Sequence, residues 1–212
     1  MSRYQIRNVT LYKWFPKDDK IAAHMARLCI LREDFSLELA SSAEDSIPTI
    51  DENGVDWRKI YFFRALCKTL LGISGVVASL QKMKEFQNFL KDQPNIKKLF
   101  DQLKEKLEQG HTIIKDIRNE VSGHILEKPM HEALDNMDLE RFGTLQIGSN
   151  FANIHYKFVS ELIMAMLFRK IPSHEQGKYA KEILDKFFGV VNAVMDAIDS
   201  VIIVYAKSRR LL

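Results

Sequence analysis

One segment of the chain combines residue types that can move a proton beside an anionic group. It runs from Ile113 to Ile125 and contains Arg118 and His124. An imidazole titrates near neutral pH, so His124 can accept and return a proton. A guanidinium stays charged and binds phosphate oxygens through paired N–H donors, a role open to Arg118. Together the two side chains suit acid–base chemistry at a phosphate.

The apolar spacing of this segment predicts a helix that docks by a narrow face. On a wheel with about 100° per residue, apolar residues flank Ile117 within about 60° on either side. If the helix continues through Gly123, His124 falls within this stripe and Arg118 lies on its margin, about 120° away. Their functional ends can then meet only through the reach of Arg118, a distortion near Gly123, or a partner chain.

Most other catalytic and cofactor signatures are absent from the sequence. It has neither of the glycine-rich loops that cradle phosphates, GxGxxG and GxxxxGK[ST], and no GxSxG elbow for an acyl-transfer serine. The segment that begins His131-Glu132 starts like a zinc-peptidase helix, but Asp135 stands where the second histidine is required. A di-iron bundle would need paired Glu-x-x-His units. We therefore expect no cofactor and no metal site.

The residues from Arg118 to His124 resemble the Arg-x(4 to 6)-His motif of HEPN domains, an all-helical superfamily that includes many ribonuclease toxins and defence effectors. Asn119 adds to the similarity, because a polar residue commonly follows the family's arginine. The resemblance implies a metal-independent endoribonuclease that leaves a 2′,3′-cyclic phosphate. In that mechanism His124 assists proton transfer at the ribose 2′-hydroxyl, Arg118 stabilises the pentacoordinate phosphate, and Asn119 orients one or both.

The resemblance also implies partners. HEPN enzymes commonly dimerise so that two motif copies face one another, and we therefore expect a homodimer that acts on RNA and spares DNA. A role in prokaryotic defence or a toxin–antitoxin system implies an antitoxin or other regulatory protein as partner. Toxins silenced by a nucleotidyltransferase often have a tyrosine two residues after the motif histidine. This chain has Leu126 there, which argues against that form of control.

Alternative interpretations stay open for the same residues. Arg118 can be a surface ion-pair former with Asp116 or Glu120, and His124 a core or helix-capping histidine. The chain would then be a catalytically inactive helical bundle that binds a protein or nucleic acid, which the net charge of only +3 mildly favours. The loose motif also occurs a second time, from Arg169 to His174, but Pro172 breaks a helix there. HEPN domains also commonly have an acidic or polar residue in the site that comes from an earlier helix, here called the acidic helper. The sequence leaves Glu33, Asp34 and Glu38 as candidates for it.

Composition predicts the class of fold that must hold these residues. The chain has 212 residues, of which 46% are apolar, but only 9 Gly and 5 Pro, which disfavours an all-β fold. Long stretches of period 3.6 predict a single all-α domain over residues 1–212, an up-and-down bundle of four to five long helices. The resemblance described above implies that this bundle is HEPN-like. Cys29 and Cys67 form no CxxC motif, and no apolar leader is present, so we expect a cytoplasmic protein. We also expect no membrane span, because Asn192, Asp196 and Asp199 interrupt the most apolar stretch.

The periodicity also places the individual elements. A third helical stretch ends near residue 123 with a break at Gly110, and residues 82–106 form a basic connector with a solvated face, in which Pro94 can begin a helix. Residues 1–18 are an N-terminal extension, and 127–149 are an irregular insertion with a short helix. Arg32 and His24 lie on the apolar stripe of the first helix as a snorkelling arginine and a packed histidine. The other expected helices cover residues 19–40, 56–83, 150–170 and 173–208.

Overall fold

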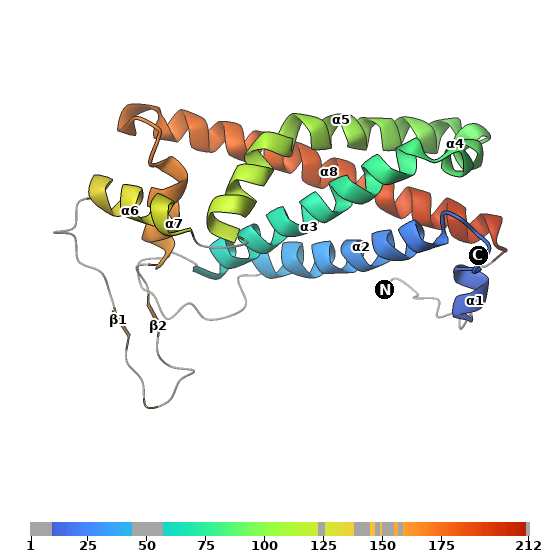
Figure 1. The fold of residues 1–212 in the computed structure, drawn as a ribbon, viewed down its shortest axis with the longest axis horizontal. Coiled ribbons are helices and arrows are strands. Elements are labelled where there is room, and N and C mark those ends of the chain that lie inside the picture. The colour runs from blue at the N-terminus through green and yellow to red at the C-terminus, as the bar shows by residue number, and fades with distance from the viewer. Residues whose placement is uncertain are drawn as a thin grey trace, which may run out of the picture. The chain divides into compact units, whose positions relative to one another are not determined.

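The computed structural model describes residues 10–43, 57–122, 126–137, 145–146, 149, 155–156 and 159–210. Within these residues almost every element is a helix (Figure 1). The exception is an antiparallel pair of two-residue strands, β1 (Leu145–Gln146) and β2 (His155–Tyr156), in which Leu145 pairs with Tyr156. The prediction of an all-α fold is therefore confirmed.

Four long helices carry most of the buried surface of the described residues. They are α2 (Ala22–Ala43), α3 (Trp57–Lys82), α5 (Pro94–Ile117) and α8 (Gln176–Ser208). The shorter elements are α1 (Leu11–Trp14), α4 (Lys84–Lys91), a π-helical turn η1 (Arg118–Ser122), α6 (Glu127–Asn136), α7 (Val159–Phe168) and a 3-10 turn η3 (Ser173–Glu175). The apolar periodicity thus located α2, α3 and α8 to within a few residues, whereas α5 begins inside the stretch that was expected to be a connector.

The structure corrects three of the expected elements. The basic connector over residues 82–106 is mostly helical, because α4 buries Phe86 and Leu90 while its lysines stay exposed. Gly110 does not break α5, since a glycine costs only about 1 kcal/mol relative to alanine and its neighbours on the stripe are buried. The helix expected over 150–170 is shorter than predicted, because residues 155–156 pair as β2 before α7 begins at Val159.

The chain divides into two compact units whose boundary falls inside the four long helices. Unit 1 contains Met1–Glu33, Gly72–Gln109 and Phe188–Leu212, and unit 2 contains Asp34–Leu71 and Gly110–Phe187. Each unit therefore has one part of α2, α3, α5 and α8. The single domain over residues 1–212 stays a prediction.

In unit 1, the first part of α2 runs antiparallel to the end of α3. Lys20, just before α2, donates from Nζ to Glu85 Oε1 of α4, just after α3, at 2.6 Å, and within α2 the side chain of Leu31 packs against Gly72 of α3. A Cβ at Gly72 would lie 2.8 Å from Leu31 Cδ2, so this close approach of the two helices depends on glycine. As the residue number rises from Lys20 to Leu31, the number of the partner falls from Glu85 to Gly72. The two segments therefore run antiparallel, as neighbouring helices do in an up-and-down bundle.

Tyr205 connects the end of α8 to Asp19, which lies three residues before the start of α2. Its side chain is almost fully buried, and its hydroxyl donates to Asp19 Oδ2 at 2.7 Å. The ring stacks on Phe15 and meets the edge of Phe89, and Arg209 lies over its face while also contacting Asp19. Burial, together with the Asp19 carboxylate, raises the pKa of the Tyr205 hydroxyl above 10.0. Unit 1 is thus closed at this end by a buried hydroxyl–carboxylate bond.

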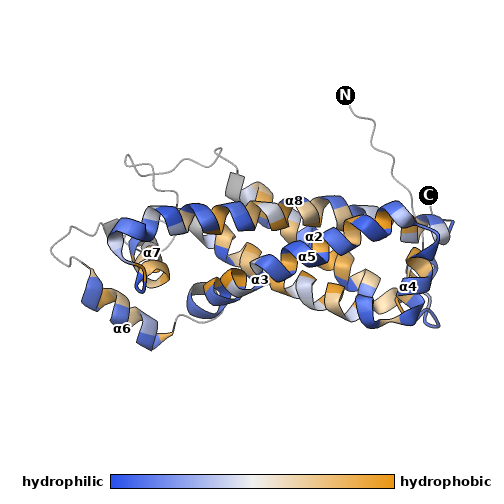
Figure 2. Ribbon diagram, turned by 90° about the horizontal axis from the view of Figure 1, so that it is seen from above, coloured by the Kyte–Doolittle hydropathy of each residue, from blue (hydrophilic) through white to orange (hydrophobic). Residues whose placement is uncertain are grey.

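Two helices are long and apolar enough to cross a membrane by length and composition. They are Tyr61–Lys82, with a mean hydropathy of 1.4, and Ser173–Ser208, with 1.9. Core helices of soluble proteins pass the same test, and Figure 2 shows polar residues among the apolar ones along α8. The expected cytoplasmic location without a membrane span therefore stays a prediction.

We expect Tyr205→Phe to lower the free energy of unfolding by about 1 kcal/mol at pH 7, because it removes one partly buried hydrogen bond. Since the pKa is raised in the folded state, the stabilisation by the Tyr205 proton is complete below pH 10.0 and declines as the pH rises above it. Urea denaturation at pH 7 and at higher pH should show a smaller alkaline loss for Tyr205→Phe than for wild type. The control is Tyr12→Phe, at a side chain that is 69% exposed. Equal alkaline losses in wild type and Tyr205→Phe would contradict this account.

Candidate functional site

The candidate site begins where α5 ends. A stripe of buried residues runs along this helix at spacings of three and four, and it confirms the predicted docking face near Ile114 and Ile117. Immediately after Ile117 the backbone changes to the π-helical turn η1. Single π turns are rare in proteins, and many of those that occur lie at functional sites. The buried stripe consists of Phe100, Leu103, Leu107, Gly110, Ile114 and Ile117.

This π turn corrects the helical wheel drawn from the sequence. A wheel with about 100° per residue assumes α-helical geometry, whereas a π turn closes from residue i to i+5, so each residue turns through a smaller angle. The wheel therefore does not describe the residues of η1. His124 lies outside the described residues. A distortion just before Gly123, one of the three routes by which Arg118 and His124 can meet, is present.

Arg118 is exposed and hydrogen-bonds to its neighbour. Its Nη1 donates to Asn119 Oδ1 at 3.0 Å. Among the described residues, no carboxylate lies within ion-pair distance of this guanidinium. The ion pair with Asp116 or Glu120 that the alternative interpretation needs is thus not formed in this part of the chain. Arg118 keeps a positive charge that faces solvent.

The carboxylate of Glu120 is bound instead by Arg169, which directly follows α7. Arg169 Nη1 donates to Glu120 Oε2 at 2.6 Å, and Nη2 donates to Oε1 at 2.8 Å, which makes the pair bidentate. Arg169 Nε donates to Glu132 Oε2 at 2.8 Å, and Nη1 also donates to the Met166 carbonyl oxygen at 2.6 Å. Every nitrogen of this guanidinium therefore has an acceptor.

The charged groups of Arg169 and Glu120 are mostly buried. The Arg169 side chain is 5% exposed and that of Glu120 is 25% exposed, so both charges are largely removed from water. The hydrogen bonds to Glu120 and Glu132 raise the pKa of Arg169, and the bond from Arg169 lowers the pKa of Glu132. The network joins η1, α6 and α7, and α7 packs against both other elements (Figure 1). It is the main polar connection around the π turn.

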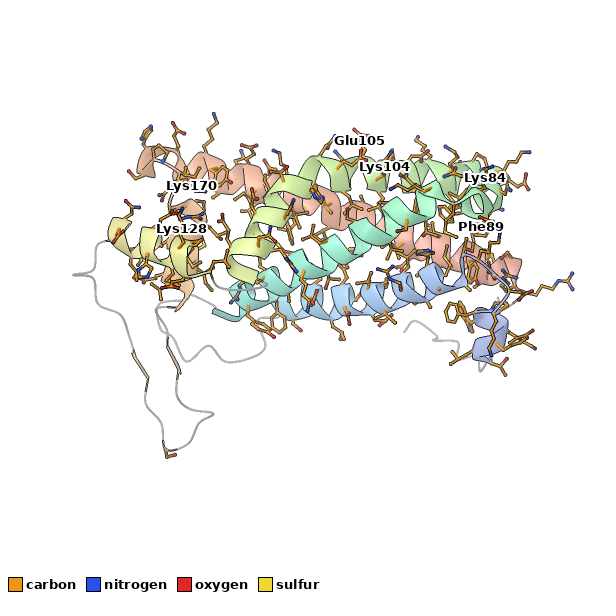
Figure 3. All side chains as sticks on the ribbon, viewed as in Figure 1. Lys84, Phe89, Lys104, Glu105, Lys128 and Lys170 are labelled. Atoms are coloured by element: carbon orange, nitrogen blue, oxygen red, sulfur yellow. The ribbon has the colours of Figure 1, made fainter. Side chains whose placement is uncertain are left out.

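Other charged groups surround this network. Lys128 on α6 and Lys170 after α7 are exposed and are labelled in Figure 3, and Lys128 Nζ lies 4.0 Å from Glu132 Oε1. Tyr179 of α8 contacts the edge of the Phe168 ring. Burial, followed by the negative charges of Asp116, Glu182 and Glu120, raises the pKa of Tyr179. The surroundings of η1 in unit 2 therefore hold several acids, and Arg118 is an exposed cation among them.

The acidic helper candidates lie in different surroundings. Glu38 of α2 accepts a hydrogen bond from Thr69 Oγ1 at 3.1 Å, and burial raises its pKa. Glu33 and Asp34 are exposed. Glu38 and Asp34 belong to unit 2, as Arg118 does, and Glu33 belongs to unit 1.

The interpretation of Arg32 as a snorkelling residue is wrong. Its Nε donates to Asp199 Oδ1 at 2.6 Å, and its Nη2 donates to Oδ2 at 2.7 Å. This bidentate pair connects α2 to α8 within unit 1, and sequence spacing could not reveal it because the partners are 167 residues apart. His24 is half-buried, and its Nδ1 has no hydrogen-bond partner among the described residues, which agrees with a packed histidine.

Comparisons of the chain with family models, with curated proteins and with solved structures find no match. Among the described residues, no group of three or more His, Cys, Asp or Glu side chains is arranged to hold a metal ion. The resemblance to HEPN domains therefore depends on the residues from Arg118 to His124 and on the all-helical fold.

We expect Arg169→Met to lower the free energy of unfolding by about 3 kcal/mol, because it leaves buried carboxylate oxygens of Glu120 without a cation. Lys128→Met is the matched control, since this side chain is 88% exposed and also faces Glu132. It should change stability by less than about 0.5 kcal/mol. Thermal and urea denaturation of the two variants checks this prediction. Equal effects of the two substitutions would show that the buried network contributes no more than a surface charge.

Proposed function

We propose that this protein is a metal-independent endoribonuclease of the HEPN type, with Arg118, Asn119 and His124 as its site. The observation that carries the proposal is the exposed guanidinium of Arg118, which has no carboxylate partner among the described residues although two acids lie within two positions of it. A cation left open to solvent, with the neighbouring Glu120 already bound by Arg169, is available to an anionic ligand. The RNA phosphate is the ligand that suits a neighbouring acid–base histidine.

The proposed reaction uses the ribose of the substrate itself as nucleophile. The 2′-oxygen loses its proton and forms a bond to the adjacent phosphorus, the bond from phosphorus to the 5′-oxygen breaks, and that oxygen takes up a proton. The products are a 2′,3′-cyclic phosphate and a 5′-hydroxyl. His124 assists the proton transfers, and Arg118 stabilises the charge that builds up on the phosphate oxygens.

Asn119 has a positioning role in this scheme. Its Oδ1 accepts the hydrogen bond from Arg118 Nη1 at 3.0 Å and so restricts the guanidinium. Restricting a long side chain before the substrate binds reduces the entropy lost in the complex. This contact supports Asn119 as the residue that orients the arginine.

The proposal includes a homodimer, because two copies can place Arg118 of one chain near His124 of the other. It also includes a cytoplasmic role in prokaryotic defence or a toxin–antitoxin system, with an antitoxin or other regulatory protein as partner. RNA is the substrate and DNA is spared, since DNA lacks the 2′-hydroxyl that the reaction needs.

Single substitutions test the site directly. In excess chelator, we expect Arg118→Ala to lower kcat by about 10²- to 10³-fold, and His124→Ala to lower it by about 10²- to 10⁴-fold. Asn119→Ala should have a smaller effect in the same direction. Cleavage of a labelled mixed-sequence RNA by purified protein measures all three.

Two exposed residues outside the motif provide matched controls for this experiment. Arg27→Ala on α2 and His111→Ala on α5 remove the same side-chain types and should leave cleavage unchanged. Equal losses in the control and motif variants would disprove the assignment. A wild type that binds RNA without cutting it would favour the inactive binding module instead.

The dimer is tested by the mass in solution. Light scattering should give twice the mass of one chain over a range of protein concentrations that includes the assay conditions. A strict monomer that cuts RNA would show that Arg118 and His124 do not need a second copy, and the dimeric part of the proposal would fail.

A further inference from the structure

We propose that the outer face of α2 pairs with the same face of α2 in a second copy of this chain, and that the two helices run antiparallel. This inference rests on the homodimer of the proposed function, to which it gives an interface, and it is independent of the cleavage reaction. The face lies on one unbroken helix. Its part up to Glu33 belongs to unit 1, as do Met195 and Ile203 of α8.

The first observation is a second apolar stripe on α2. One face of the helix is buried, at Met25, Leu28 and Phe35. On the opposite side, residues recur at alternating spacings of three and four, the heptad pattern by which one helix packs along another. Its two large apolar members, Ile30 and Leu37, are 62% and 66% exposed. This outer stripe consists of Ala23, Ala26, Ile30, Glu33, Leu37 and Ala40.

The charges along the outer stripe favour an antiparallel pair. Arg27 and Asp34 are exposed on the same edge of the stripe, and neither forms an ion pair among the described residues. In an antiparallel pair, Ala26 of one copy lies opposite Leu37 of the other. The same arrangement places Arg27 beside Asp34 of the second copy, and two-fold symmetry forms this ion pair twice. A parallel pair would instead place Glu33 against Glu33, and like charges in contact are unfavourable.

The neighbouring part of α8 extends the surface of the outer stripe within unit 1. Arg32 of α2 binds Asp199 of α8, and its Nη1 also lies 3.9 Å from Glu33 Oε1, which belongs to the outer stripe. Met195 and Ile203 lie four residues on either side of Asp199, so they share its face of α8. They are 50% and 44% exposed. The apolar surface therefore continues from α2 onto α8.

The exposed apolar area is sufficient for a dimer. Ile30, Leu37, Met195 and Ile203 each leave about half of the side chain or more in water, which amounts to roughly 400 Å² of apolar surface. Since about 65% of a homodimer interface is apolar, this area corresponds to an interface of about 600 Å² per copy. That value is at the lower end of the range for stable interfaces, which begins at about 1,200 Å² in total.

Disulfide cross-linking tests the pairing and its direction. In a Cys29→Ser background, we expect the double variant Ala26→Cys/Leu37→Cys to form a covalent dimer on mild oxidation, measured by non-reducing electrophoresis. Within one chain the two positions are about 16 Å apart along the helix, too far for a disulfide. The single variants Ala26→Cys and Leu37→Cys are the controls and should stay unlinked. A parallel pair would link each single variant to itself, and that result would overturn the inference.

Reversal of the charges gives a second test. Arg27→Glu should raise the dissociation constant of the dimer by about 10-fold or more, because both ion pairs become repulsive. The double variant Arg27→Glu/Asp34→Arg should return it to near the wild-type value. Exposed pairs of this kind select the orientation and contribute little affinity, so Arg27→Ala leaves the dimer assembled. Light scattering over a dilution series measures all three variants, and a double variant as weak as Arg27→Glu would contradict the antiparallel pairing.

The outcomes separate this inference from the proposed function. A protein that is dimeric by light scattering but forms no cross-link in the double cysteine variant would overturn the α2 interface and leave the proposed homodimer standing. The expected cross-link in a protein whose wild type cuts no RNA would support the α2 interface while the proposed ribonuclease fails. A strict monomer without a cross-link would overturn both the interface and the homodimer.

Discussion

The buried ion-pair network of Arg169 is the interaction on which the candidate site depends. A charge removed from water is strongly destabilising unless acceptors surround it, and Arg169 has carboxylate or carbonyl acceptors on all three nitrogens. Two of its partners come from elsewhere in the sequence, 49 and 37 residues away. Short elements that would bury little apolar surface alone, η1, α6 and the end of α7, are thereby connected by directional bonds. Arg169 is thus a buried cation that is compensated, whereas Arg118 on η1 is an exposed cation with no carboxylate partner among the described residues.

Apolar periodicity predicted the long helices because each of them buries a continuous stripe. On α5 that stripe outweighs Gly110, so a local signal for a break was misleading. The sequence pattern does not reveal α4 because it lies in the lysine-rich stretch 82–106, although Phe86 and Leu90 are four residues apart on its buried face. The pairing of β1 with β2 joins residues nine and eleven positions apart with no strong alternating pattern, and a helix was expected at β2 instead.

Parts of the site follow from local sequence and other parts do not. Arg118 and Asn119 were found as neighbours in a motif, and their hydrogen bond needs only that adjacency. The bond from Arg169 to Glu120 depends on how α7 packs against η1, which no spacing encodes. In the sequence, Arg169 is only the arginine of a second motif, which Pro172 interrupts. Its position after a run of apolar residues in α7 was the one local sign of a buried charge.

The central claim is that an exposed arginine and a histidine cleave RNA through its own 2′-hydroxyl. The most direct measurement uses an RNA oligonucleotide with a single cleavage position, its counterpart with one 2′-deoxy substitution at that position, and excess chelator. The account predicts cleavage of the RNA to a 2′,3′-cyclic phosphate end, identified by mass, and no cleavage at the deoxy position. Equal cleavage of both oligonucleotides, or a product with a 3′-hydroxyl, would contradict it.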